Sequence, residues 1–289
     1  MPDLSREMAG SLELEPTAAL VMAWAKDLYR EGSAARFYSR LDLSAGRRMK
    51  RECDSVCPWY PEVMMNRKWF IRHLASEAVS GARGSCQVVI LAAGKSPLAL
   101  ELLDGHPEKI AAVIETDIAG MEEKQKIYGA VAPGAAKRIR CVQADICDRE
   151  GTIEAIAATA IYDPRRATLV VFEGISYYIP PAGSSGVLSL FASEDRQNTV
   201  ILDSLLPCRF VREDRRYISL GIWGIIHRDC KFQSTVTYSP EEMEMMLFSA
   251  GCGEVCHHAM DEMELLRTGR NQCFPTAEHG WIRISTGRL

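Results

Sequence analysis

Hydrophobic and polar positions change their spacing along this chain. Residues 15–83 carry apolar side chains at helical spacing without strand patterns, and the clearest helix is predicted from Glu62 to Val79. From Cys86 onward, short continuous apolar runs alternate with helical segments. Runs of this kind are typical of parallel strands that are covered on both faces. The pattern therefore predicts an α/β fold, with a helical N-terminal part that precedes a doubly wound sheet.

The predicted sheet has seven strands and is mostly parallel. Strands are predicted at 86–92, 110–117, 139–145, 167–173, 198–203, about 253–258 and 280–285. Helices are predicted between them, and the clearest start is Ser239-Pro240-Glu241-Glu242, with a capping serine and proline at the first position. We interpret 1–83 as a helical cap and 84–289 as the core. Within the core, 204–238 is predicted to be an irregular insertion that lines a substrate site.

The stretch 86–103 predicts a buried strand, a tight turn and a helix in direct succession. Ala92 to Gly94 are small enough for a ligand to lie against their backbone. Ser96 is predicted to cap the following helix, with Pro97 at its first position. A helix start in this place would direct backbone donors toward a ligand.

Three interpretations of this turn compete. Gly94-Lys95-Ser96 suggests a phosphate-binding loop, but the first glycine of that motif would fall on Val89. A dinucleotide-binding turn requires three glycines, where this chain has Ala92, Gly94 and Pro97. The third interpretation is a buried strand–helix unit of any α/β protein, which the stretch alone leaves open.

Composition limits the classes of partner. Hydrophobic residues make up 47% of the 289 residues, charged residues 25%, and the net charge is −4, so no basic footprint for nucleic acid is present. No apolar run approaches the ~18 residues of a membrane helix. The ten cysteines, in a chain that begins without an apolar signal segment, are those of a reduced, cytoplasmic protein. No cysteine spacing matches a structural zinc site, so no metal is predicted, although His257 and His258 beside Cys256 keep one open.

Acidic residues follow several of the predicted strands. Because parallel strands end at one edge of a sheet, where ligands of open α/β folds bind, these carboxylates are expected to lie near one another. A carboxylate at the end of the second strand suits the two hydroxyls of a ribose. The residues concerned are Glu115, Asp117, Asp145, Glu173 and Asp203.

The ordered motifs resemble the leucine carboxyl methyltransferase-like family of class I S-adenosylmethionine (SAM) methyltransferases. The resemblance rests on Val-Ile-Leu-Ala-Ala-Gly-Lys-Ser, Val-Ile-Glu-Thr-Asp-Ile, Cys-Val-Gln-Ala-Asp-Ile and Leu-Val-Val-Phe-Glu-Gly-Ile-Ser-Tyr-Tyr-Ile-Pro-Pro, in this order. It extends upstream to Asn-Arg-Lys-Trp-Phe-Ile at 66–71, so motifs cover about 66–203. The family's fold is a Rossmann-like sheet, and its cofactor is SAM, which becomes S-adenosylhomocysteine.

The resemblance implies roles for particular residues. Arg67 would pair with the SAM carboxylate and Glu173 with its amino group, while Gly94 would lie against the methionine part. The remaining cofactor contacts that it implies are Ala92 in the turn, Asp117 with Glu115 at the ribose, and Asp145 with Ile146 at the adenine. Two departures are Ala92 in place of the first glycine of the family's turn and Lys95-Ser96 in place of its Asp-Thr.

Methyl transfer from a sulfonium depends mainly on positioning, and a base is needed only when the acceptor must lose a proton. A carboxylate acceptor needs none, whereas a phenol, amine or activated carbon would require a His or Tyr nearby. Tyr177 and His227 are the predicted catalytic residues. Tyr178, Arg209 and Trp223 are the predicted substrate contacts.

The sequence thus predicts a SAM-dependent methyltransferase that acts on a small molecule in specialised metabolism, with neither nucleic acid nor a membrane as partner. One alternative is a non-catalytic SAM-binding regulator or scaffold with the same fold. Another is a nicotinamide oxidoreductase, against which the absent third glycine argues. The sequence indicates neither the acceptor nor the oligomeric state.

Overall fold

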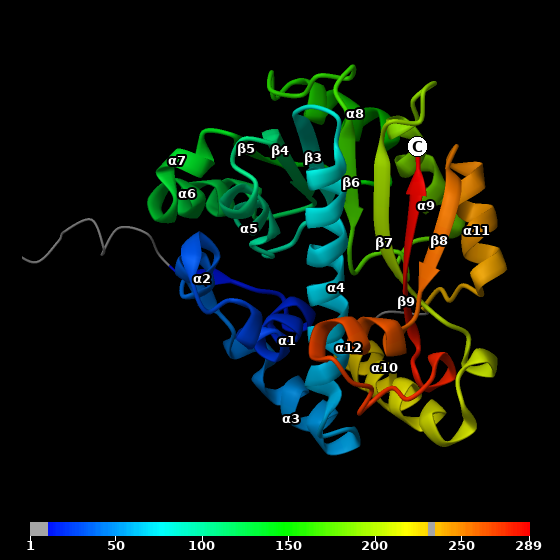
Figure 1. Ribbon diagram of the computed structural model, residues 1–289. Coiled ribbons are helices and arrows are strands. Elements are labelled where there is room, and N and C mark those ends of the chain that lie inside the picture. Colours follow the sequence, from blue (N-terminus) through cyan, green and yellow to red (C-terminus); the bar gives the residue numbers. More distant parts are fainter. Residues whose placement is uncertain (1–10, 231–234) are drawn as a thin grey trace, which may run out of the picture.

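A seven-stranded sheet forms the centre of the protein in the computed structural model, which describes residues 11–230 and 235–289 (Figure 1). The strand order is β5-β4-β3-β6-β7-β9-β8, in which β3 to β7 are parallel and β9 runs antiparallel to both of its neighbours. The strands are β3 (Cys86–Leu91), β4 (Ile110–Asp117), β5 (Ile139–Gln143), β6 (Thr168–Phe172), β7 (Thr199–Leu205), β8 (Gly253–His258) and β9 (Ile282–Arg288). The predicted mostly parallel, seven-stranded α/β sheet is confirmed.

Strand β3 lies at the point where the direction of winding reverses. From β3 the chain adds β4 and β5 on one side, then crosses back to place β6 on the other side of β3. The register sets Val89 opposite both Ile114 and Val170. In such folds the ligand site lies beyond the carboxyl ends of the two strands at the reversal. The segments after β3 and β6 are therefore the places to search for a site.

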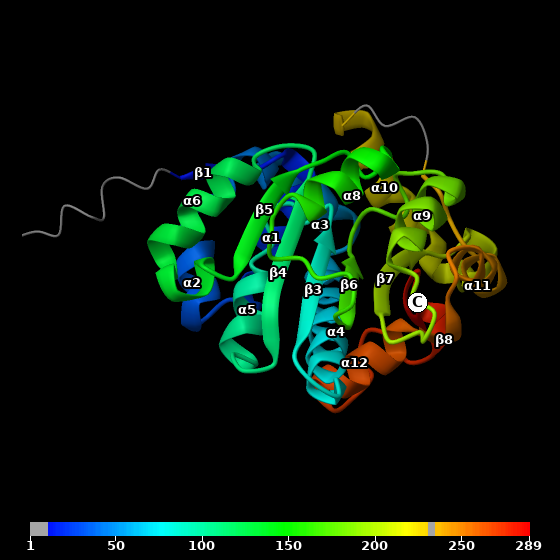
Figure 2. The same ribbon diagram turned by 90° about the horizontal axis from the view of Figure 1, so that it is seen from above.

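Helices cover both faces of the sheet, as the view from above shows (Figure 2). Alternate residues of β3 point to opposite faces, so Val88 belongs to one hydrophobic core and Val89 to the other. The core of Val88 includes residues of Tyr60–Gly81 (α4) and Leu98–Gly105 (α5), and the core of Val89 includes residues of Pro181–Leu188 (α9) and Pro240–Ser249 (α11). Every residue of β3 is buried, as its continuous apolar run predicts. The helices after β3 are α5 (Leu98–Gly105), α6 (Met121–Val131), α7 (Pro133–Ala136), α8 (Arg149–Ala157), α9 (Pro181–Leu188), α10 (Arg216–Cys230), α11 (Pro240–Ser249) and α12 (Met260–Thr268).

The N-terminal part is mainly helical, and its last helix belongs to the sheet's own packing layer. Helix α4 crosses in front of the sheet (Figure 1), and its Phe70 and Ile71 share one core with Ile90 of β3. The prediction that this part lacks strands is wrong, because two short parallel strands pair there. Its elements are β1 (Leu12–Glu13), α1 (Pro16–Trp24), α2 (Gly32–Tyr38), β2 (Leu41–Asp42), α3 (Arg47–Val56) and α4 (Tyr60–Gly81).

The prediction of an irregular segment at 204–238 is wrong for much of its length, since α10 occupies its centre; residues 231–234 lie outside the described residues. Ile218, Ile222 and Ile226 recur every four residues and are buried, which is a helical pattern. The glycines at 221 and 224 weaken that pattern in the sequence. Gly221 has a packing reason, because a Cβ there would lie 2.9 Å from Val56 Cγ1.

Other element boundaries also differ from the predictions. Helix α5 begins at Leu98 with Pro97 as its N-cap, so Ser96 is not the capping residue. Helix α12, between the last two strands, was not expected from the sequence. The start of α11 is confirmed in detail, because Ser239 and Glu242 form a reciprocal capping box. In the part of the chain that the structure describes, no helix is both long and apolar enough to span a membrane.

Candidate functional site

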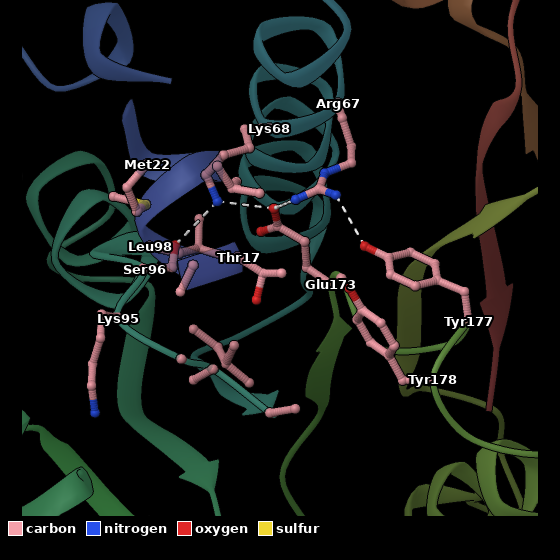
Figure 3. A pocket seen from close by; sticks show the side chains of 17 residues that line it. Thr17, Met22, Arg67, Lys68, Lys95, Ser96, Leu98, Glu173, Tyr177 and Tyr178 are labelled. Carbon is pink, nitrogen blue, oxygen red and sulfur yellow. Dashed lines mark hydrogen bonds and ion pairs between the residues drawn. The ribbon is translucent and has the colours of Figure 1, made fainter. Parts of the chain in front are cut away.

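A pocket of about 170 Å³ lies beyond the carboxyl ends of β3 and β6 (Figure 3). The turn after β3 and the segment after β6 form its floor and one wall, and α1 and α4 close it from the N-terminal part. Its position is the one that the reversal of winding at β3 predicts. The lining residues are Thr17, Ala18, Val21, Met22, Arg67, Lys68, Ile90, Ala92, Ala93, Gly94, Lys95, Ser96, Leu98, Glu173, Gly174, Tyr177 and Tyr178.

The turn after β3 presents its backbone to the pocket. Gly94 has φ +51°, in the left-handed region, and a Cβ built on it would meet nothing within 4 Å. The space that a side chain would fill is therefore open at this glycine. Ala92 also has a positive φ, of 49°, which is strained for a residue with a Cβ. Lys95 points away from the pocket (Figure 3), and its Nζ donates to the Gly120 carbonyl at 2.9 Å.

Two cations and two carboxylates meet at the opposite wall. Arg67 Nη2 and Lys68 Nζ lie 3.2 and 2.9 Å from the same oxygen, Oε1 of Glu173. Arg67 Nη1 lies 3.4 Å from Oδ2 of Asp203 and donates to the hydroxyl of Tyr177 at 3.1 Å. The two cationic side chains are each 5% exposed, Glu173 is 11% exposed and Asp203 is fully buried. The cluster thus contains equal numbers of cations and carboxylates, and little of it is exposed to solvent.

Different elements hold these side chains in place. Arg67 and Lys68 are consecutive residues of α4, whose core-facing side fixes the helix against the sheet. Asp203 lies within β7, and its Oδ1 accepts the Gly174 N–H at 2.6 Å. Glu173 follows β6 directly, which places it at the sheet edge next to the turn of β3.

The protonation states follow from these contacts. Burial opposes ionisation of Glu173, but Lys68 and Arg67 together hold its pKa below the ordinary value. Burial raises the pKa of Asp203, and the nearby Arg67 offsets this only in part. Burial also raises the pKa of Tyr177 well above the ordinary value. The Tyr177 hydroxyl is therefore a neutral phenol at physiological pH.

The acid after β4 is tied to the turn of β3. Asp117 accepts the Gly94 N–H at Oδ2 and the Ile118 N–H at Oδ1, both at 2.7 Å. A carboxylate has about four acceptor positions, so two remain. Glu115, by contrast, is fully buried and pairs with Lys124 at 2.8 Å. It lies outside the pocket lining, and its side chain is fully buried.

The acid after β5 lies farther from the pocket. Asp145 is exposed and accepts the Cys147 N–H at 2.9 Å, and Ile146 is buried. Neither residue lines the pocket, although Ile146 belongs to the same apolar cluster as Ala92. Both follow β5, the strand that pairs with β4 on the side away from β3.

Three aromatic side chains form one group at the pocket, which Tyr177 and Tyr178 line. The rings of Tyr177 and Tyr178 lie 4.8 Å apart, and Trp223 of α10 lies 5.1 and 5.9 Å from them. His227 contacts Trp223 and hydrogen-bonds Thr235, so it is one layer farther from the pocket. Arg209 is exposed over the ring of Phe210 and does not line the pocket.

The sequence reasoning missed two members of the charged cluster. Lys68 received no role because its neighbour Arg67 carried the motif, and only the helix geometry shows that both side chains reach Glu173. Asp203 was noted as an acid at a strand end, but its pairing with Arg67 is a tertiary contact that no local pattern signals.

The histidines near the C-terminal strands have ordinary partners. His257 lies 2.8 Å from the Ser285 hydroxyl, and His258 lies 2.9 Å from Glu262. Among residues 11–230 and 235–289, no three His, Cys, Asp or Glu side chains gather in a way that would hold a metal ion.

Solved structures with the same architecture span nearly the whole chain. A provisionally assigned methyltransferase from Thermobifida fusca YX has a TM-score of 0.68 at 15% identity, and the match covers 99% of this chain and 98% of that one. A DUF574 family protein from Streptomyces avermitilis MA-4680 has a TM-score of 0.69 at 12% identity, over 95% and 97% of the two chains. At these identities the likeness shows the fold. A search of curated proteins finds no match.

A family model matches the sequence itself. The model for leucine carboxyl methyltransferase covers residues 17–192, which include α1 from its second residue, the Arg67 helix, the turn of β3 and the acid after β6. The match spans more than half of the chain and contains every segment that lines the pocket. The protein is therefore a member of the leucine carboxyl methyltransferase family.

Proposed function

We propose that the protein transfers a methyl group from SAM to a small-molecule acceptor. The observation that carries the proposal is the pairing of Arg67 and Lys68 with Glu173 beside the open turn at Gly94. The amino-acid end of SAM is a zwitterion, so it requires cations for its carboxylate and an anion for its ammonium group. Both charges are available on one wall of the pocket, within the family's matched region.

The residues present fit the cofactor. The space above Gly94 is open, and Arg67 Nε is buried without a hydrogen-bond partner among the described residues. We assign the amino-acid end to Arg67 and Glu173, the ribose to the two remaining acceptor positions of Asp117, and the adenine to the side of Asp145 and Ile146. When bound there, SAM supplies an electrophilic methyl group on its sulfonium.

The residues that line the pocket favour an acceptor that need not lose a proton before it is methylated. In the described pocket the ionisable groups are cations, phenols and Glu173, which is already ion-paired. Tyr177 is held as a neutral phenol by burial, which leaves it as a donor that can orient an acceptor oxygen. A carboxylate meets these conditions, because its oxygens are nucleophilic at neutral pH.

The acceptor would enter between α1 and the aromatic group. Thr17, Val21 and Met22 face the pocket from α1, and Tyr178, supported by Trp223, faces it from the other side. We therefore keep Trp223 as an indirect substrate contact and α1 as the cap of the site. His227 and Arg209 do not line the pocket and could reach it only if their segments moved. We therefore assign neither of them a role in the reaction.

Calorimetric titration with S-adenosylhomocysteine tests cofactor binding. Asp117→Ala should weaken binding by about 1–3 kcal/mol, since ribose hydroxyls would be left unpaired. Asp195→Ala, an exposed change before β7 and so at the opposite edge of the sheet, is the matched control and should leave affinity unchanged. Absence of binding by the unmodified protein would refute the proposal.

Transfer itself is tested with SAM that carries a labelled methyl group. Incubation with a panel of small carboxylic acids should yield labelled esters. Tight binding without product across carboxylate, phenol and amine acceptors would instead favour a SAM-binding regulator of the same fold.

A further inference from the structure

Both cations of the cluster converge on a single carboxylate oxygen. Arg67 and Lys68 approach Oε1 of Glu173 from two directions, at 3.2 and 2.9 Å, and Figure 3 shows the three side chains meeting at the wall of the pocket. Lys68 Nζ also donates to Ser96 Oγ, at 3.5 Å. A carboxylate gripped by two buried cations is the arrangement that an amino-acid ligand's own carboxylate would require.

We propose that Arg67 and Lys68 form a two-cation clamp for the carboxylate of the cofactor, and that Glu173 fills this clamp until the cofactor binds. On binding, the cofactor's carboxylate replaces Glu173 between the cations, and Glu173 turns to the ammonium group of the same ligand. This inference rests on the proposed function and adds Lys68 and the exchange of carboxylates to it.

The charge balance supports an exchange rather than a simple addition. The cluster contains two cations and two carboxylates, Glu173 and Asp203, and it is almost dry. A third carboxylate added to the same place would leave one negative charge without a partner, which is strongly unfavourable in a buried site. A zwitterion brings one charge of each sign, so every charge keeps a partner if Glu173 moves from the cations to the ammonium group.

Asp203 keeps Arg67 in place during the exchange. It is fully buried in β7 and accepts the Gly174 N–H at 2.6 Å, so its position is fixed by the sheet. Its pairing with Arg67 holds that guanidinium while Glu173 leaves. Lys68 has no such second carboxylate within ion-pair distance among the described residues, so its partner must be either Glu173 or the ligand.

Two ligands separate the clamp from the rest of the site. S-adenosylhomocysteine carries the amino-acid end, and 5′-methylthioadenosine lacks it but keeps the adenosine and the sulfur. We expect Lys68→Met to lower affinity for S-adenosylhomocysteine at least tenfold and to leave affinity for 5′-methylthioadenosine within twofold. Lys126→Met, an exposed lysine of α6 that pairs with Glu122, is the control and should change neither affinity.

The outcomes are distinct. If the unmodified protein binds neither ligand, the proposed function itself fails. If it binds both and Lys68→Met binds S-adenosylhomocysteine within twofold of the unmodified protein, or loses both ligands equally, the clamp is refuted while the proposed function stands. A structure of the unmodified protein with S-adenosylhomocysteine decides the matter without any variant. Lys68 Nζ on the ligand's carboxylate supports the exchange, and Lys68 still on Glu173 refutes it.

Discussion

Replacing Arg67 by methionine should damage stability and binding for separate reasons. In the folded protein Arg67 is the cation that faces Asp203, at 3.4 Å, and it shares Glu173 with Lys68. Arg67→Met keeps most of the apolar volume of the side chain but leaves Asp203 buried without a cation. Removal of one partner from a buried ion pair lowers the free energy of unfolding by about 3–5 kcal/mol. We expect a loss in this range, and a loss of affinity for S-adenosylhomocysteine of at least tenfold.

A second substitution separates the two effects. Asp203→Asn removes the carboxylate charge but keeps an oxygen that can accept the Gly174 N–H. In the Arg67→Met/Asp203→Asn variant no unpaired charge remains at that position. We therefore expect it to be more stable than Arg67→Met alone, with a coupling energy of about 1–3 kcal/mol between the sites. Binding should not recover, because the guanidinium for the cofactor's carboxylate is still missing.

Urea unfolding of the four proteins at one pH gives the coupling energy, and calorimetry gives the affinities. A double variant that is no more stable than Arg67→Met would show that the loss comes from packing and not from the unpaired carboxylate. A double variant that regains affinity would show that Arg67 acts only by neutralising Asp203. Either result would refute the prediction.

Two further predictions concern neighbouring residues. Burial raises the pKa of Glu101 to about 7 from its ordinary 4.5, even though Arg72 lies 2.5 Å away. The protein should therefore lose up to about 3 kcal/mol of stability as pH rises from 4.5 through 7, and Glu101→Gln, which mimics the protonated form, should be the more stable protein in urea at pH 8 but not at pH 4; equal pH profiles would contradict this. Ala92→Gly should raise the free energy of unfolding by up to about 1 kcal/mol, because relief of the positive φ outweighs the added chain entropy of glycine; a loss of stability in the same assay would count against it.

Elements that depend on local patterns were predictable from the sequence. Strand β4 begins and ends as predicted, because its short length and its β-branched residues favour a buried strand over a helix. Helix α10 was missed because two glycines interrupt its apolar face, and the reason for Gly221 is the close approach of Val56, a contact from a distant segment. Local propensity carries no information on such a contact.

The site residues also divide into those that sequence motifs mark and those that only tertiary contacts place. Arg67, Gly94 and Glu173 were identified because motifs mark them, and the structure brings all three to one pocket. The family resemblance implied that Glu115 helps Asp117 at the ribose, whereas in the structure Glu115 is buried and pairs with Lys124. The contacts of Lys68 and Asp203 depend on how α4 lies against β6 and β7, and that arrangement is a property of the whole fold.

The position of β9 determines how late the sheet can be completed during synthesis. It is the last strand in this sequence, yet it lies between β7 and β8 and sets Ile284 directly opposite Asp203. During synthesis, β7 leaves the ribosome long before this partner does. The carboxylate that faces Arg67 therefore stays beside an open sheet edge until Ile282–Arg288 has been translated. The sheet edge beside the charged wall of the pocket is therefore covered only after Ile282–Arg288 has been made.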